Sequence, residues 1–200
     1  MPGKGRLGLL LLLIAAPVAA QSTGTPVFHA PYRAFQRTEI GASISDQGNI
    51  SLEGFYGMSQ SGGKWDLSLR GGVQDDGPGG RTALLAGVDG RFRVIDQTED
   101  FPLDGAIILG VGTRLVRDAS RLLIPIGLSV GRRLRFENSS ITLVPYAEPL
   151  IAPTFGSGGS DVLVALGLGG DLRLSRRFEV RVGVGIGDIE NFSVSFAYTR

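Results

Sequence analysis

Apolar residues recur at every second position along most of the chain from residue 35 onward. Ten stretches show this alternation, separated by turn-forming clusters such as Ser61-Gly62-Gly63 and Glu137-Asn138-Ser139. A period of two is typical of β-strands, and no stretch sustains the period of a helix. We therefore predict an all-β, antiparallel up-and-down fold of ten strands, with eight as the alternative count because residues 97–102 keep no clear pattern. The strands are expected at about 35–46, 49–59, 64–74, 81–95, 103–117, 121–134, 140–151, 161–174, 177–187 and 190–199.

The two faces of the predicted strands differ in chemistry. One face is aliphatic and aromatic and almost free of charge, with Arg132 near a strand end as the main exception. The other face combines small residues with charges, and all of its bases are arginine. Such a balance suits a confined interior, where guanidinium groups pair with carboxylates through two parallel hydrogen bonds. The acids are Glu39, Glu53, Asp66, Asp89, Asp104, Glu148, Asp171 and Glu179, and the bases are Arg37, Arg70, Arg91, Arg93, Arg114, Arg133, Arg173 and Arg181.

Two kinds of closed barrel fit this pattern. A soluble lipocalin-like barrel would turn the aliphatic face inward around an apolar ligand, and a transmembrane barrel would turn it outward against lipid. If the first strand runs outward from the periplasm, six aromatic residues of the apolar face fall at the periplasmic rim. Aromatic girdles are typical of a bilayer interface, so this placement favours the transmembrane β-barrel. The six residues are Tyr56, Trp65, Phe92, Phe178, Phe196 and Tyr198.

The N-terminus has the pattern of a secretory signal peptide. Two basic residues precede an apolar run over residues 7–16, and Val18-Ala19-Ala20 supplies the small residues of a cleavage site. The run is too short to cross a bilayer as a helix. We expect residues 1–20 to be a signal peptide, residues 21–34 an extended periplasmic lead-in and residues 35–200 the barrel.

The C-terminal part of the chain carries a family resemblance. In VALGLGGDLRLSRRFEVRVGVGIGD a Gly-rich strand, a tight basic turn and a second strand follow one another, and NFSVSFAYT comes after them. On these residues, residues 35–200 resemble the small outer-membrane β-barrel proteins of Gram-negative-type bacteria, the eight- to ten-stranded OmpA/OmpX-like barrels. The resemblance implies an outer-membrane location, and it implies that Phe196 and Tyr198 are recognised by the outer-membrane assembly machinery. The final residue, Arg200, departs from the family's aromatic terminus.

Three prolines fall inside predicted strands. Pro125 lies in the sixth strand, and Pro145 and Pro149 lie in the seventh. Proline cannot donate a hydrogen bond to a β-ladder and is confined to sheet edges and bulges. We therefore expect either bulges at these positions or a weak seam in the barrel wall.

Composition removes several kinds of chemistry. The 200 residues contain no Cys and one His, and 20 Lys and Arg against 19 Asp and Glu give a net charge of +1. Absence of Cys excludes disulfides, Cys-ligated zinc and thiol nucleophiles. A net charge near zero gives no general attraction to nucleic acid.

Three sequence features could carry chemistry, and we assign a role to none of them. His29, the only His, lies in the lead-in before the first strand, where an incidental role is far more expected than catalysis. The Asp75-Asp76 pair lacks a third carboxylate for Ca²⁺. Gly167-Leu168-Gly169 and Gly183-Val184-Gly185 lack the strand-to-helix context of a nucleotide loop. We expect no catalytic, cofactor-binding or metal-binding residues and no cofactor.

The sequence thus predicts a non-enzymatic, monomeric, integral outer-membrane β-barrel with a structural, interaction or minor permeability role. Its partners would be outer-membrane lipids and the assembly machinery, and its charged lumen should be largely filled. The first alternative is a soluble periplasmic lipocalin-like barrel that binds an apolar ligand. The second is a membrane-embedded enzyme that modifies lipid or peptide, a chemistry that generally needs a His with a Ser or carboxylate partner.

Overall fold

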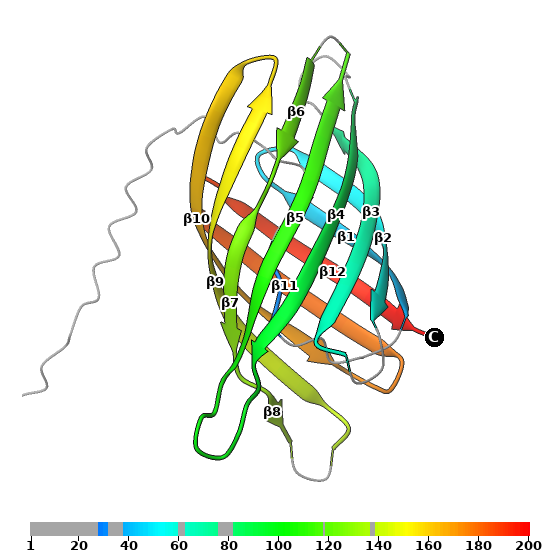
Figure 1. Cartoon of the computed structure of the whole chain (residues 1–200). Helices are drawn as coiled ribbons and strands as arrows, with labels where there is room; N and C mark the ends of the chain where they lie inside the picture. The colour runs from blue at the N-terminus through cyan, green and yellow to red at the C-terminus, as the bar shows by residue number, and fades with distance from the viewer. Residues whose placement is uncertain (1–27, 32–37, 60–62, 76–81, 118, 137–138) are drawn as a thin grey trace, which may run out of the picture.

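The chain folds into one closed antiparallel β-barrel (Figure 1). The computed structural model describes residues 28–31, 38–59, 63–75, 82–117, 119–136 and 139–200. The strands are β1 (Glu39–Asp46), β2 (Ile50–Ser59), β3 (Trp65–Asp75), β4 (Thr82–Ile95), β5 (Asp104–Val116), β6 (Ala119–Leu123), β7 (Ile126–Gly131), β8 (Leu134–Arg135), β9 (Thr142–Gly156), β10 (Gly159–Arg173), β11 (Phe178–Gly187) and β12 (Asn191–Thr199). Among the described residues there is no helix long and apolar enough to cross a membrane.

The barrel wall has ten strands, as the alternation predicts. β6 and β7 lie end to end as one wall strand between β5 and β9, and the two-residue β8 only extends the pairing of β9. β12 closes the cylinder by pairing with β1 over the whole of β1, from Glu39 opposite Thr199 to Asp46 opposite Phe192. The signal-peptide region, residues 1–20, lies outside the described residues, as does Arg37.

Side chains alternate between the lumen and the outside, because successive residues of a strand point to opposite faces. In β1, Glu39 is 1% exposed and faces the lumen, whereas its neighbour Ile40 is 60% exposed on the outer surface. The same alternation places Glu53 inside and Leu52 outside in β2. The aliphatic face therefore lies outside and the charged face inside. The lipocalin-like alternative, which needs an aliphatic interior, is wrong.

The prolines cause no bulge. The pairing of β9 with β6 and with β7 keeps a single register, with Leu123 opposite Thr154 and Ile126 opposite Ile151. Within the described residues, a register irregularity does occur in β4, between Arg93 and Ile95. The prolines instead remove hydrogen-bond donors from a ladder whose register is continuous. Of the two expectations, this agrees with a weak seam in the barrel wall and not with bulges.

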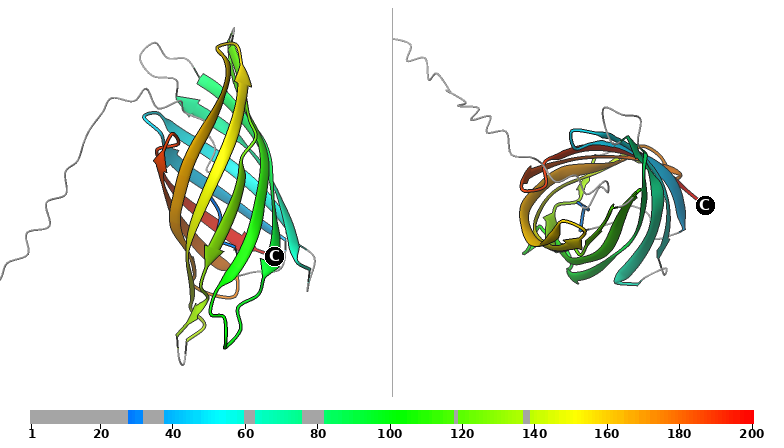
Figure 2. Two further views of the ribbon diagram at one scale, coloured as in Figure 1. Left: turned by 60° about the vertical axis from the view of Figure 1, so that its left-hand side comes forward. Right: turned by 90° about the horizontal axis from the view of Figure 1, so that it is seen from above.

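Residues 28–31 lie inside the barrel (Figure 2). Phe28, Ala30 and Pro31 are buried, and Phe28 and Ala30 belong to the same apolar cluster as Tyr146 and Leu150 of β9. An extended periplasmic lead-in does not describe these four residues, because luminal contacts fix them. We call residues 28–31 the luminal segment.

Candidate functional site: the filled barrel interior

The largest ionic cluster of the lumen centres on Arg181 of β11. Its guanidinium donates to both carboxylate oxygens of Glu39 at 3.0 and 2.7 Å and to Glu179 Oε1 at 2.6 Å, and its Nε lies 3.7 Å from Asp171 Oδ2. The guanidinium carbon also lies 5.5 Å from the ring centre of Phe55, a cation–π distance. One arginine thus contacts carboxylates from β1, β10 and β11 and links these three wall strands through their side chains.

Three further arginines pair with acids across neighbouring strands. Arg70 Nε lies 2.9 Å from Asp89 Oδ1, and Arg91 Nε lies 2.9 Å from Asp66 Oδ1, so β3 and β4 exchange two ion pairs. Arg133, between β7 and β8, has its Nε 2.6 Å from Oδ2 of Asp104 at the start of β5. These contacts confirm the inward placement of the predicted charges that take part in them. The predicted arginines and acids do not all pair with one another, since Arg93 forms an ion pair at 2.8 Å with Asp96, which is not one of the predicted acids.

Glu53 and Glu148 are the exceptions among the luminal acids. Both are buried, and neither oxygen of Glu53 has a hydrogen-bond partner within the described residues. Glu148 Oε2 accepts a hydrogen bond from a backbone amide, that of His29, at 2.6 Å, and Oε1 has no such partner in the described part of the chain. The equal numbers of acids and arginines predicted for the inner face therefore conceal an uneven distribution of charge in space.

Two glycines of the barrel wall leave the space that the Phe28 ring occupies. A Cβ built on Gly167 of β10 would lie 2.0 Å from Cδ1 of the Phe28 ring, and one on Gly185 of β11 would lie 2.6 Å from its Cε2. Real Cβ atoms do not approach so closely, so the ring occupies space that only glycine leaves open. Both residues belong to the Gly-x-Gly runs considered as nucleotide-loop motifs. Their role in the structure is steric.

The polar atoms of the luminal segment bind three wall strands. Ser129 Oγ of β7 donates to the carbonyl oxygen of His29 at 2.5 Å, and the amide of His29 donates to Glu148 of β9. Arg91 of β4 donates from Nη1 to the carbonyl oxygen of Ala30 at 2.7 Å. Nearly all buried backbone polar groups need such partners, and here the wall side chains supply them. Sequence reasoning missed this segment.

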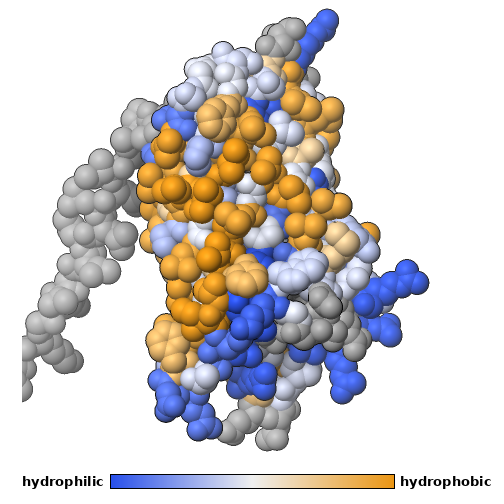
Figure 3. All heavy atoms as spheres, viewed as in Figure 1, coloured by the Kyte–Doolittle hydropathy of each residue, from blue (hydrophilic) through white to orange (hydrophobic). Residues whose placement is uncertain are grey.

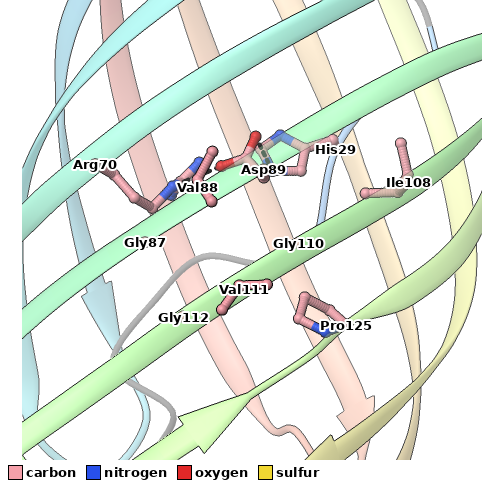
Figure 4. Close-up of a pocket in the computed structure, with 10 residues that line it drawn as sticks. All are labelled: His29, Arg70, Gly87, Val88, Asp89, Ile108, Gly110, Val111, Gly112 and Pro125. Atoms are coloured by element: carbon pink, nitrogen blue, oxygen red, sulfur yellow. Dashed lines mark hydrogen bonds and ion pairs between the residues drawn. The ribbon is translucent and has the colours of Figure 1, made fainter.

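The imidazole of His29 points toward Asp89 and Arg70 (Figure 4). His29 Nε2 lies 3.3 Å from Asp89 Oδ2. The cavity beside this group measures about 20 Å³, the space of one water molecule, and extends into the wall beside Gly110 of β5 and Pro125. No Ser, Thr or Cys is among its described lining residues. Among the described residues that line this cavity, the arrangement orients an imidazole beside a carboxylate without a hydroxyl or thiol nucleophile.

Larger hollows lie where the strands end. A cavity of about 370 Å³ is lined by Arg114, Arg121 and the turn between β9 and β10, and one of about 480 Å³ is lined by residues 97–99 and by Arg132, Arg133 and Arg135. No group of three or more potential metal ligands occurs within the described residues. Of the Asp75-Asp76 pair, Asp76 lies outside the described residues.

The outer surface carries a broad apolar belt, seen on one face in Figure 3. All six aromatic residues predicted for one rim point outward, from Phe196 at 62% exposure to Tyr198 at 36%. Register places them along one end of neighbouring strands: Trp65 is opposite Phe92, and the rings of Phe178 and Tyr198 lie 5.3 Å apart. This end also holds residues 38 and 200, whose backbones share a hydrogen bond.

Comparison with known proteins supports the fold. No family model matches the chain, and no curated protein matches it. Among solved structures, the chain is similar to a bacterial polysaccharide outer membrane secretin (TM-score 0.50, 10% identity, 84% of this chain and 67% of that one). It is also similar to the β-domain of the Bordetella autotransporter BrkA (TM-score 0.52, 16% identity, 83% of this chain and 100% of that one). The chain thus has the closed antiparallel fold of outer-membrane β-barrels, and these similarities do not single out the OmpA/OmpX-like group.

Proposed function

We propose that the protein is an integral β-barrel of the bacterial outer membrane whose lumen is closed, with a structural or interaction role rather than an enzymatic one. The observation that carries this proposal is the inverted distribution of side chains, aliphatic outside and charged inside. In water, so much exposed apolar surface would drive aggregation, whereas in a bilayer it replaces lipid–lipid contacts.

The dimensions of the wall fit a bilayer. β11 and β2 have 10 residues each. Ten residues extend about 33 Å and, at a tilt of about 40°, cross about 25 Å, the height of the apolar band of outer-membrane barrels. The aromatic residues at one end of the belt suit the interface between lipid and water. With both ends of the barrel domain at that rim, it would be the periplasmic one.

The closed lumen argues against a role as an open channel. Porins with a water-filled lumen have 16–18 strands, and a barrel of about eight strands is just wide enough for side chains to fill. Here ten wall strands surround ion pairs and the luminal segment. Conductance would therefore be small. Phe196 and Tyr198, outward-facing at the end of β12, suit recognition by the assembly machinery.

Fractionation of cells that express the full chain tests the proposal. The protein should remain with outer membranes after extraction with sodium carbonate, need detergent for release, and migrate faster on a gel before boiling than after it. In planar lipid bilayers the purified barrel should give no porin-sized conductance. Release of the protein by osmotic shock, without detergent, would overturn the membrane assignment, and a large steady conductance would overturn the closed lumen.

A further inference from the structure

The backbone pairing between β7 and β9 has a gap in the middle. Ile126 is opposite Ile151 and Val130 is opposite Ala147, but the intervening pairs Leu128–Pro149 and Ser129–Glu148 are absent from the ladder. The closure ladder between β1 and β12, by contrast, runs without a break from Glu39 to Asp46. We call the junction of β6–β7 with β9 the seam.

The prolines of β9 explain the gap. The carbonyl oxygens of Pro145 and Pro153 accept hydrogen bonds from the amides of Arg132 and Ile124, so the backbones of both prolines face β6–β7. Pro149, midway between them, faces the same way, because alternate residues of a strand point their N and C=O to the same neighbour. A proline nitrogen carries no hydrogen. Three donors are therefore missing from one ladder, at every second hydrogen-bonding position.

Pro125 weakens the other side of the same wall strand. It separates β6 from β7, and its carbonyl oxygen accepts a hydrogen bond from the amide of Gly110 of β5 at 2.9 Å. Its nitrogen cannot return that bond. The ladders on both sides of the wall strand β6–β7 thus lack donors, those of the β9 prolines on one side and that of Pro125 on the other.

The luminal segment spans the gap from inside. Ser129 and Glu148, the unpaired positions of the seam, both point into the lumen and are fully buried. The carbonyl oxygen of His29 accepts a hydrogen bond from Ser129 of β7, and the amide of His29 donates to Glu148 of β9. One residue of the luminal segment therefore joins the two strands where their own ladder is interrupted.

From this geometry we propose that the barrel wall opens at the seam between β7 and β9, and that residues 28–31 are the latch that holds it closed. Leu128 and Pro149 face outward and Ser129 and Glu148 face inward. An opening here connects the polar lumen with the apolar outer surface. Local openings of this kind concentrate where backbone hydrogen bonds are few, and this wall strand is such a place.

Hydrogen–deuterium exchange on the full chain folded in detergent micelles tests the latch. Ser129→Ala removes one latch bond, and we expect exchange of the Val130 and Ala147 amides to accelerate about tenfold while the β1–β12 ladder is unchanged. Ser43→Ala is the matched control, because Ser43 is also a buried luminal serine but its hydroxyl has no partner within the described residues. Equal acceleration in both ladders, or none at the seam, would overturn the proposal.

A disulfide across the seam gives an independent test. The chain has no Cys, so Ile126→Cys with Ile151→Cys can form only one disulfide, between outward-facing residues that pair across the seam beside its gap at a spacing a disulfide tolerates, and Pro149 stays in place. In the oxidised form, Ser129→Ala should no longer accelerate exchange at the seam. In the reduced form of the same variant the acceleration should return. The same response in both forms would show that the seam is not where the wall opens.

Discussion

Arg181 of β11 and Glu39 of β1 form an ion pair through two parallel hydrogen bonds, and their strands flank β12, the strand that closes the barrel. The residues lie 142 positions apart in the chain and come together only when the last strand finds the first. The same guanidinium also contacts Glu179 and Asp171, so loss of Arg181 would leave three buried carboxylates without their shared cation.

Arg181→Ala should therefore destabilise the barrel by about 3–5 kcal/mol, the cost of removing one partner from a buried ion pair. The measurement is urea unfolding of the protein folded in phospholipid vesicles, followed by the fluorescence of the single Trp, Trp65. Arg176→Ala, in the exposed turn before β11, is the control and should leave the midpoint unchanged. Equal midpoints for both variants would mean that the Arg181 cluster is hydrated and contributes little.

Arg70→Glu should cost several kcal/mol, because it places a new carboxylate beside Asp89, the present partner of Arg70. Arg177→Glu, on an exposed residue of the turn before β11, is the matched charge reversal. Urea unfolding in vesicles again gives the comparison. A wild-type midpoint for Arg70→Glu would indicate that the charged face is open to water.

Gly167→Ala should displace Phe28 and destabilise the barrel by about 1–3 kcal/mol, as overpacking does in a filled interior. In a Phe28→Ala background the same substitution should cost almost nothing, so the double-mutant cycle should show a coupling of similar size. Gly158→Ala, whose Cβ would meet no atom within 4 Å, is the control. Additive effects of Gly167→Ala and Phe28→Ala would contradict the direct packing of the Phe28 ring against Gly167.

The strand pattern and the charged interior could be predicted from the sequence because both depend on local alternation. In β11, Glu179 and Arg181 alternate with Val180 and Val182, which assigns each to a face without knowledge of the tertiary structure. The partner of each charge could not be predicted. That Arg181 meets Glu39 depends on barrel closure and on register across β12.

The luminal segment escaped prediction because four residues carry no periodicity. Its position is set by distant contacts, such as that between Phe28 and Gly167. A signal for the seam was nevertheless present: Pro145, Pro149 and Pro153 are spaced by four residues, which points every proline nitrogen to the same neighbouring strand. That spacing favours an interrupted ladder over separate bulges.

Val182→Arg tests the outer face. Val182 lies at mid-height of β11 and points outward, so an arginine there should cost about 2–4 kcal/mol in vesicles, as at the middle of a bilayer. Leu174→Arg, next to the turn at the rim, should cost about 0–1 kcal/mol. Unfolding midpoints in vesicles provide the comparison. In a barrel surrounded by water, neither substitution would have a measurable cost.

The depth of a tryptophan in lipid vesicles tests the central claim, that the aliphatic face meets hydrocarbon. The test variant carries Val182→Trp in a Trp65→Phe background, so that its single indole lies on the outer face at mid-height. Lipids brominated in the middle of the acyl chain should quench its fluorescence more strongly than that of native Trp65 at the rim, and aqueous iodide should quench it little. Strong quenching by iodide with no effect of the brominated lipids would contradict the account.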